Sequence, residues 1–540
     1  MQMTQGMDLE QLRNFARRHA RFLWCLAASL LTGLCAHAYF YTGLGFSQDS
    51  LMLYTNDVDW QISLGRFMIP VYYYLRGRFT VPWLLGLYCI LYAAISASLI
   101  ASMMNIRKAG HLLLLCGIIM TNAAVTAQTA TYVHVIDIYM LAFLMATLSV
   151  WFLWRFRFGF LVGIPLLMVG VGLYPAYFAA AAALCVLLVI QQLLDNAITP
   201  KQLWLTIAKA LLMLLCALLL YAAGVRVALW LSGTPLSQGY NGISGVGDFT
   251  GYSVMELLED LYRYVVRFLK NPTANAPMLI RWCNLLMGVA AMVQLVRLVV
   301  LRRPVWWRLL LVGVALVLLP LAANITYFLS KGMFHGVMTM PLYLLYLFIL
   351  LTHIWAQDAA LAAKDSAADN TVPKKCWLRR LAIAVIPLLL CIWMVDNVQF
   401  ANASYLKKRL EAQSTLSVMT RVIDRIENTE GYRPRETAVV FIGDLNLNSA
   451  LNPSRIDYHS LKQTGDRVPG YEYEYAISYP WSYRYYMNYL LGYPIRLGHE
   501  GLIEQYTANE TVQAMPAFPD VGCIQWIGED LIVKLSNKSY

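Results

Sequence analysis

Four charged residues follow the first long apolar stretch of the chain, where a membrane edge is expected. Three of them, Asp49, Asp57 and Asp59, carry carboxylates, and in an interfacial helix Asp49 and Asp57 would share roughly one face. Arg66 carries a planar guanidinium, which pairs well with a phosphate or a carboxylate. A bland alternative is a set of solvated loop charges beside a membrane belt of aromatic side chains. The gathering of acids at this one point favours a functional interpretation.

Aromatic side chains in the same segment extend this chemistry to sugars. Trp60 and Tyr54 present flat faces on which a sugar ring could stack. No His or Cys lies close in sequence to the three aspartates, so no single motif builds a metal cluster here, and no residue is assigned as a metal ligand. Carboxylates together with water could still hold a hard divalent cation, Mg²⁺ or Mn²⁺.

The elements that must position these residues are membrane-spanning helices. Hydrophobic residues make up 59% of the 540-residue chain and charged residues only 14%, well below the usual share in soluble proteins. A bilayer core needs roughly 20 apolar residues per helix. Residues 22–48, 79–106, 109–136 and 158–194 contain no Asp, Glu, Lys or Arg. The fold class is therefore a polytopic α-helical membrane protein.

The order of the spans follows from the distribution of basic residues. Arginines precede the first span, which places the N-terminus in the cytoplasm, and the loops that then lie inside are the basic ones. Eleven spans place the C-terminus outside. Near Tyr174-Pro175, a proline kink within one long helix is the alternative to two spans. The predicted spans are 22–44, 80–104, 110–128, 132–154, 159–173, 176–194, 207–232, 280–301, 306–327, 337–355 and 379–397.

Two domains are expected. Residues 1–397 form a transmembrane domain with external loops 45–79 and 233–279. The first loop is expected to hold an interfacial helix, and "YSVMELLEDLYRYVVRFLK" in the second has apolar residues at helical spacing. Residues 398–540 have room for one small extracytoplasmic α/β domain. There, "TAVVFIGDL" and "LIVKLS" read as strands, and residues 402–428 as an amphipathic helix.

Other polar residues lie near the expected outer face. Arg226, near the outer end of the seventh span, is either a second phosphate contact or a side chain that snorkels to the interface. Asp137 and His134 either orient an acceptor or cap the fourth span. Further candidates for binding lipid headgroups or substrate are Arg76, Arg78, Lys331 and His335.

The tail is unusually aromatic, and the chain is basic overall. The stretch "YEYEYAISYPWSYRYYMNYLLGY" is either a sugar-stacking acceptor surface or a packed core. The net charge of +11 comes largely from short basic loops and is not accompanied by a nucleic-acid-binding module, so nucleic acid is not an expected partner.

The opening segment also resembles a known family. An acid just after the first span, then Trp60, then Gly65-Arg66, is similar to the first external loop of the bacterial O-antigen glucosyltransferases. These are the serotype-converting type II glucosyl transferases, often carried by phage. "GLYPAYFAAAAALCVLLV" resembles the family's short span, turn and small-residue span, and "AMPAFPDVGCIQWIGEDLIVKLS" resembles its closing segment.

The resemblance implies roles for the charged residues. It implies a GT-C-like membrane glycosyltransferase in which Asp49 is the general base and Arg66 holds a lipid phosphate. The family often has two adjacent acids in this loop, whereas here the position reads Gln48-Asp49. Asp57 or Asp59 would then supply the second carboxylate.

The implied reaction moves a sugar, with glucose expected, from polyprenyl phosphate (undecaprenyl phosphate in bacteria) to a glycan. The acceptor would be O-antigen, lipopolysaccharide or another cell-surface glycan at the periplasmic face of the bacterial inner membrane. A flippase and a donor synthase are implied pathway partners. The alternatives are a flippase or transporter of lipid-linked sugars, which predicts repeats and charges at the membrane midplane, and an O-antigen polymerase- or ligase-like protein.

Overall fold

The protein consists of two compact units, which are described separately. The computed structural model describes residues 14, 17–43, 45–54, 58–77, 79–238, 253–270, 277–332, 335–366, 377–448, 450–451, 476–478 and 480–538. The helical unit comprises Met1–Ala38, Val58–Gln128 and Val135–Ala401. The sheet unit comprises Tyr39–Asp57, Thr129–His134 and Asn402–Tyr540. The domain boundary at residue 397 stays a prediction.

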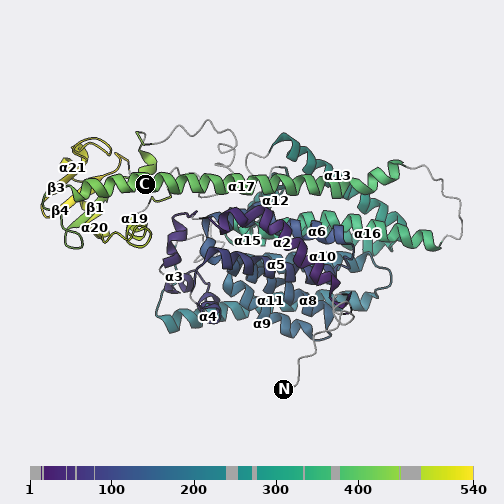
Figure 1. Ribbon diagram of the computed structural model, residues 1–540. Coiled ribbons are helices and arrows are strands. Elements are labelled where there is room, and N and C mark those ends of the chain that lie inside the picture. Colours follow the sequence, from purple (N-terminus) through teal and green to yellow (C-terminus); the bar gives the residue numbers. More distant parts are fainter. Residues whose placement is uncertain are drawn as a thin grey trace, which may run out of the picture. The chain divides into compact units, whose positions relative to one another are not determined.

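Helices account for most of the described chain (Figure 1). In order they are α2 (Ala20–Tyr41), α3 (Val58–Ser63), α4 (Met68–Arg76), α5 (Pro82–Met103), α6 (Ala109–Met120), α7 (Ala123–Thr131), α8 (Ile136–Arg155), α9 (Gly159–Leu173), α10 (Phe178–Leu193), α11 (Pro200–Ser232), α12 (Val254–Lys270), α13 (Met278–Arg302), α14 (Trp306–Ala323), α15 (Ile325–Leu329), α16 (Leu344–Ser366) and α17 (Trp377–Glu427).

The predicted polytopic membrane fold is confirmed. Within the described residues, nine helices are long and apolar enough to cross a membrane, or ten if α6 and α7, bent by 43° at their junction, form one span. The remaining predicted span, 159–173, coincides with α9, an apolar helix of 15 residues that is shorter than a typical crossing. Each of the eleven predicted spans therefore overlaps an apolar helix or helix pair.

The interior of the helical unit is built around α8. This helix packs against α5 and α9, α9 packs against α11, and α10 packs against α14. The break predicted at Tyr174-Pro175 is present, because α9 ends at Leu173 and a 3-10 turn precedes α10. Tyr174 has an extended backbone, with φ −152° and ψ 110°, as the residue before a proline prefers.

The amphipathic helix expected in the second external loop is α12. Its described side chains bury Leu257, Leu261, Val265 and Phe268 along one face. The first of the two loops expected to be external, residues 45–79, is more divided than a single interfacial helix. It holds a 3-10 turn, η1 (Asp49–Tyr54), followed by the short helices α3 and α4.

The sheet unit contains a four-stranded sheet in the order β2-β1-β4-β3. The strands are β1 (Ala438–Ile442), β2 (Arg496–Leu497), β3 (Ile524–Ile527) and β4 (Asp530–Lys534). β1 pairs in parallel with β2 and β4, and β3 pairs antiparallel with β4. The two predicted strands are thus β1 and β4, the central pair. Figure 1 shows the sheet with α20 (Glu500–Thr507) and α21 (Glu510–Ala514) at the C-terminal end of α17.

Successive side chains of β1 point to opposite faces of the sheet and pack into two different cores. Val439 and Phe441 pack in a core with the last turns of α17. Val440 and Ile442 face a smaller core with α20 and α21. The predicted small α/β arrangement is therefore present. The amphipathic helix expected over 402–428 continues the last span without a break, because residues 397–402 contain neither Gly nor Pro.

Candidate functional site

Arg66 is held by the backbone turn that ends α3. The amide of Arg66 donates to the carbonyl of Gln61 and the amide of Gly65 to that of Ile62, each at 2.9 Å. This pair of hydrogen bonds is a Schellman motif, whose left-handed position favours glycine, and Gly65 has φ +74°. Nη1 of Arg66 also donates to Oε1 of Gln61 at 3.3 Å.

The next residue, Phe67, anchors this turn to two spanning helices. A Cβ built on Gly224 of α11 would lie 2.5 Å from Cζ of Phe67, and one on Gly172 of α9 would lie 3.1 Å from the same atom. The Phe67 ring also lies 5.9 Å, centre to centre, from that of Tyr221. The absence of side chains at the two glycines thus makes room for Phe67 and fixes the place of Arg66.

Arg66 and Arg226 line the same cavity of the helical unit. The cavity has a volume of about 420 Å³. Its lining is mostly apolar, with Leu64, Leu218 and Leu329 among its residues. The guanidinium carbon of Arg66 lies 5.1 Å from the centre of the Tyr174 ring, which also lines the cavity. Two cations in an apolar wall suit a ligand with an anionic head and an apolar tail.

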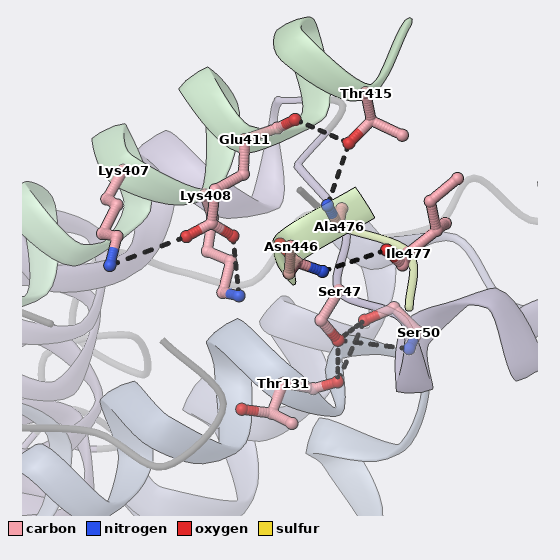
Figure 2. A network of polar contacts seen from close by, with 10 residues as sticks. All are labelled: Ser47, Ser50, Thr131, Lys407, Lys408, Glu411, Thr415, Asn446, Ala476 and Ile477. Atoms are coloured by element: carbon pink, nitrogen blue, oxygen red, sulfur yellow. Dashed lines mark hydrogen bonds and ion pairs between the residues drawn. The ribbon is translucent and has the colours of Figure 1, made fainter. Parts of the chain in front are cut away.

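Asp49 lies in the sheet unit, at the start of η1. The hydroxyls of Ser47 and Ser50 both donate to the carbonyl oxygen of Thr131, at 2.6 and 3.0 Å, and so fix the turn that carries it (Figure 2). Burial raises the pKa of Asp49, and the positive charge of Lys408 reduces that rise. A hydrogen bond with the Tyr132 side chain acts in the same direction as Lys408.

Lys408 belongs to a buried charge network on α17. Its Nζ donates to Oε2 of Glu411 at 2.8 Å, and Nζ of Lys407 lies 3.9 Å from Oε1 of the same carboxylate (Figure 2). The side chains of Lys408 and Glu411 are only 2% and 0% exposed. Thr415 donates to the carbonyl of Glu411 and accepts from the amide of Ala476, at 2.8 and 2.9 Å. The network joins α17 to a distant part of the tail.

Asp137 is in a buried ion pair. Its carboxylate accepts hydrogen bonds from Nη1 of Arg76, at 2.6 and 2.7 Å, and from the hydroxyl of Tyr72 at 2.9 Å. The side chains of Arg76 and Asp137 are 2% and 0% exposed. The expectation that Arg76 reaches lipid headgroups is therefore wrong, because Arg76 is folded inward onto an acid on α8.

A family model described as "Glucosyl transferase GtrII" matches residues 46–353, which is more than half of the chain. The chain belongs to the GtrII family. The resemblance noted in the first external loop is thus confirmed. No curated protein and no solved structure matches this chain.

The GtrII match covers some candidate residues and leaves others outside. Asp49, Arg66 and Arg226 lie within it, whereas Lys408, Glu411 and the four strands lie beyond residue 353. As a GtrII member, the protein is a glycosyltransferase with many membrane-spanning helices, in agreement with the predicted class.

The other predicted site residues fall on several elements. Asp59 is exposed on α3, and Trp60 beside it is half-buried. His134 is buried in the 3-10 turn before α8, Lys331 is half-buried after α15 with φ +52°, and His335 is exposed. Asp57 and Arg78 lie outside the described residues, as does the side chain of Tyr54. Among described residues, no group of three or more His, Cys, Asp or Glu is placed to hold a metal.

Sequence reasoning missed the Lys408–Glu411 pair, although a signal was present. Buried residues of α17 follow helical spacing through Tyr405, Ala412 and Met419. Lys408 and Glu411 occupy positions on this same face, where an apolar residue is expected. Charged residues on the apolar face of a helix therefore marked the network. The sequence carries no comparable signal for the contact of Tyr132 with Asp49 or for that of Tyr174 with Arg66.

Proposed function

We propose that this GtrII-family protein transfers glucose from a polyprenyl-phosphate carrier to an O-antigen or other cell-surface glycan. The observation that carries the proposal is the cavity in which Arg66 and Arg226 interrupt a mostly apolar lining. A prenyl phosphate combines an anionic head with an apolar chain, so it matches both parts of that lining. The family match supports glucosyl transfer in general.

In the proposed mechanism the acceptor hydroxyl oxygen attacks the anomeric carbon of the donor sugar. Its proton passes to the carboxylate of Asp49, which burial makes more basic than an ordinary aspartate. The bond between the anomeric carbon and the phosphate oxygen breaks, and polyprenyl phosphate leaves with the electron pair. Arg66 and Arg226 stabilise the charge of this leaving group. Asp57 or Asp59 is the proposed second carboxylate.

The proposed location follows from the charge pattern of the loops. The N-terminus lies in the cytoplasm, the chain crosses the bacterial inner membrane, and the C-terminal domain lies in the periplasm. The donor and acceptor would then meet on the periplasmic side.

The direct test uses the full-length protein in nanodiscs with polyprenyl-phosphate [¹⁴C]glucose and isolated O-antigen. Label is expected to appear in the glycan, and Asp49→Asn is expected to abolish its appearance. Glu500→Gln, which changes an exposed acid on α20, is the matched control and should retain transfer. Glycan chains that lengthen by whole repeats would instead identify a polymerase. With the protein in sealed vesicles, label that crosses the membrane without joining a glycan would identify a flippase.

A further inference from the structure

The sheet unit contains a polar pocket for which the family match gives no role. Its volume is about 510 Å³, and Arg435, Arg484 and Arg496 line it together with Asn488 and Gly492. None of the described residues in its lining is acidic. All of them lie beyond residue 353, where the GtrII match ends. A concave site with three guanidinium groups is an anion site by its charge.

Each arginine comes from a different segment of the sheet unit, and Arg435 lies in the turn before β1. Arg496 is in β2, the edge strand, and its Nη1 donates to the backbone carbonyl of Glu436 at 2.8 Å, which positions the side chain without neutralising its charge. Arg435 adopts φ +67°, a left-handed conformation that is unfavourable for a side chain of this size. Such backbone strain persists where the surrounding structure enforces it, and it often occurs at binding sites.

Arg484 lies on a helix that also carries a row of aromatic rings. The helix is α19 (Pro480–Tyr485), and the wider helical turn Tyr486–Leu490 follows it. The ring centres of Trp481 and Tyr485 are 5.7 Å apart, and those of Tyr485 and Tyr489 are 5.8 Å apart and stacked. Tyr489 is 51% exposed. Aromatic faces beside hydrogen-bonding side chains suit a sugar ring with a charged substituent.

The other side of this helix packs against the segment that carries Asp49. Tyr483 and Tyr486 are buried in the core of the sheet unit together with Leu51, two residues after Asp49. The rings of Phe46 and Tyr486 are 5.4 Å apart. This helix therefore exposes Arg484 and Tyr489, whereas Trp481 and Tyr485 are half-buried and pack against the same core that supports the turn of the proposed base.

We propose that the arginine pocket binds the carboxylate or phosphate group of an acidic glycan, which is the acceptor. The term acceptor rests on the proposed function, whereas binding of the acidic glycan does not. The arginines hold the anionic group, and the exposed ring of Tyr489, at the end of the aromatic row, stacks against a neighbouring sugar ring. The aromatic tail is thus mostly packed core, and Tyr489 is its exposed sugar-binding ring.

The test measures equilibrium binding of tri-galacturonate and of its neutral methyl ester to the full-length protein in phosphatidylcholine nanodiscs. The acidic sugar should bind more tightly, and Arg484→Gln or Arg496→Gln should each weaken it by about tenfold or more, since each removes a charged hydrogen-bond donor. Arg433→Gln is the matched control, because Arg433 is an exposed arginine of the same unit that does not line the pocket. Inorganic phosphate should compete with the sugar.

Three results would overturn the proposal. These are equal binding of the acid and its ester, equal effects of the pocket and control variants, and displacement of the sugar by phosphatidylglycerol vesicles but not by phosphatidylcholine vesicles. The last result would show that the pocket binds lipid headgroups.

Asp49→Asn separates this proposal from the proposed function. The variant should bind tri-galacturonate normally while it fails to transfer glucose. If no glucosyl transfer is found with any acceptor but binding depends on the three arginines, the proposed function fails and the acidic-glycan site stands. If transfer occurs and Arg484→Gln leaves the KM for an acidic acceptor unchanged, the pocket proposal fails and the function stands.

Discussion

At the scale of single residues, the buried carboxylates differ in how they are paired. Asp49 is partly desolvated, and its pKa is raised by burial and held back by Lys408. Asp137 is fully buried but is bonded to Arg76 and Tyr72. Asp49 therefore accepts a proton more readily than an ordinary aspartate. The ion pair of Asp137 with Arg76 instead holds α4 and α8 together. Asp49 is therefore the better candidate for chemistry.

Replacement of Asp49 by asparagine should separate activity from stability. Loss of a general base lowers turnover by about 10²- to 10⁴-fold. Because the folded pKa of Asp49 is raised, the folded state binds more protons than the unfolded state between the two pKa values, so ionised Asp49 lowers the free energy of unfolding at neutral pH. Thermal unfolding of D49N should therefore occur at an unchanged or higher temperature. A lower Tm together with lost activity would point to a structural role.

Replacement of Lys408 should move the pH profile. Without the positive charge that lowers the pKa of Asp49, this pKa rises further, and the acid limb of kcat/KM shifts to higher pH. Lys408→Met alone also leaves Glu411 poorly paired, which typically reduces stability by about 3–5 kcal/mol.

The double variant Lys408→Met/Glu411→Leu removes both buried charges and serves as the control for this loss of stability. It should unfold at a temperature close to that of the wild type and keep the shifted pH profile. A wild-type profile in the double variant would show that Lys408 does not act on Asp49.

At the scale of elements, a tight turn and two glycines in helices position Arg66. A Schellman turn with Gly65 places Arg66, and glycines on α9 and α11 receive Phe67. The sequence predicted Arg66 and Arg226 as phosphate contacts separately, because each lies near the expected outer face. Their convergence on one cavity depends on the packing of α3, α9 and α11, which hydropathy does not specify.

A methyl group at Gly224 should displace Phe67 and, with it, Arg66. The new Cβ would lie 2.5 Å from the Phe67 ring, so Gly224→Ala should raise the KM for the prenyl-phosphate donor several-fold or more. Gly288→Ala on α13 is the matched control, because a Cβ there meets no atom within 4 Å. Steady-state kinetics with varied donor concentration measures the effect, and equal KM values for the two variants would contradict it.

The ion pair between α4 and α8 should stabilise the fold rather than take part in catalysis. Asp137→Asn leaves the buried Arg76 without its counter-charge, so we expect a loss of about 3–5 kcal/mol. Arg76→Met/Asp137→Leu, which removes both charges, should recover most of that stability and retain transfer. Thermal unfolding of both variants in detergent provides the measurement, and an inactive but stable double variant would indicate a direct role in the reaction.

At the scale of the whole molecule, the sequence predicted the fold class better than the site. Spans could be predicted because length and hydropathy are properties of a continuous stretch. The central strands β1 and β4 were recognisable as short apolar runs, whereas β2, with two residues, carries no such signal. The single helix α17 was divided in the prediction because polarity changes near residue 397, although no residue there breaks a helix. Prediction of the buried Lys408–Glu411 pair would have required placing charged residues on the apolar face of the helix.

Arg66 and Arg226 are proposed to hold the phosphate of a prenyl-linked donor. The Kd of the full-length protein in nanodiscs for polyprenyl-phosphate glucose, with neutral polyprenol as the comparison ligand, tests this proposal. We predict that Arg66→Gln and Arg226→Gln each weaken donor binding by about tenfold or more and leave polyprenol binding unchanged. Donor binding at wild-type affinity in both variants would contradict the account.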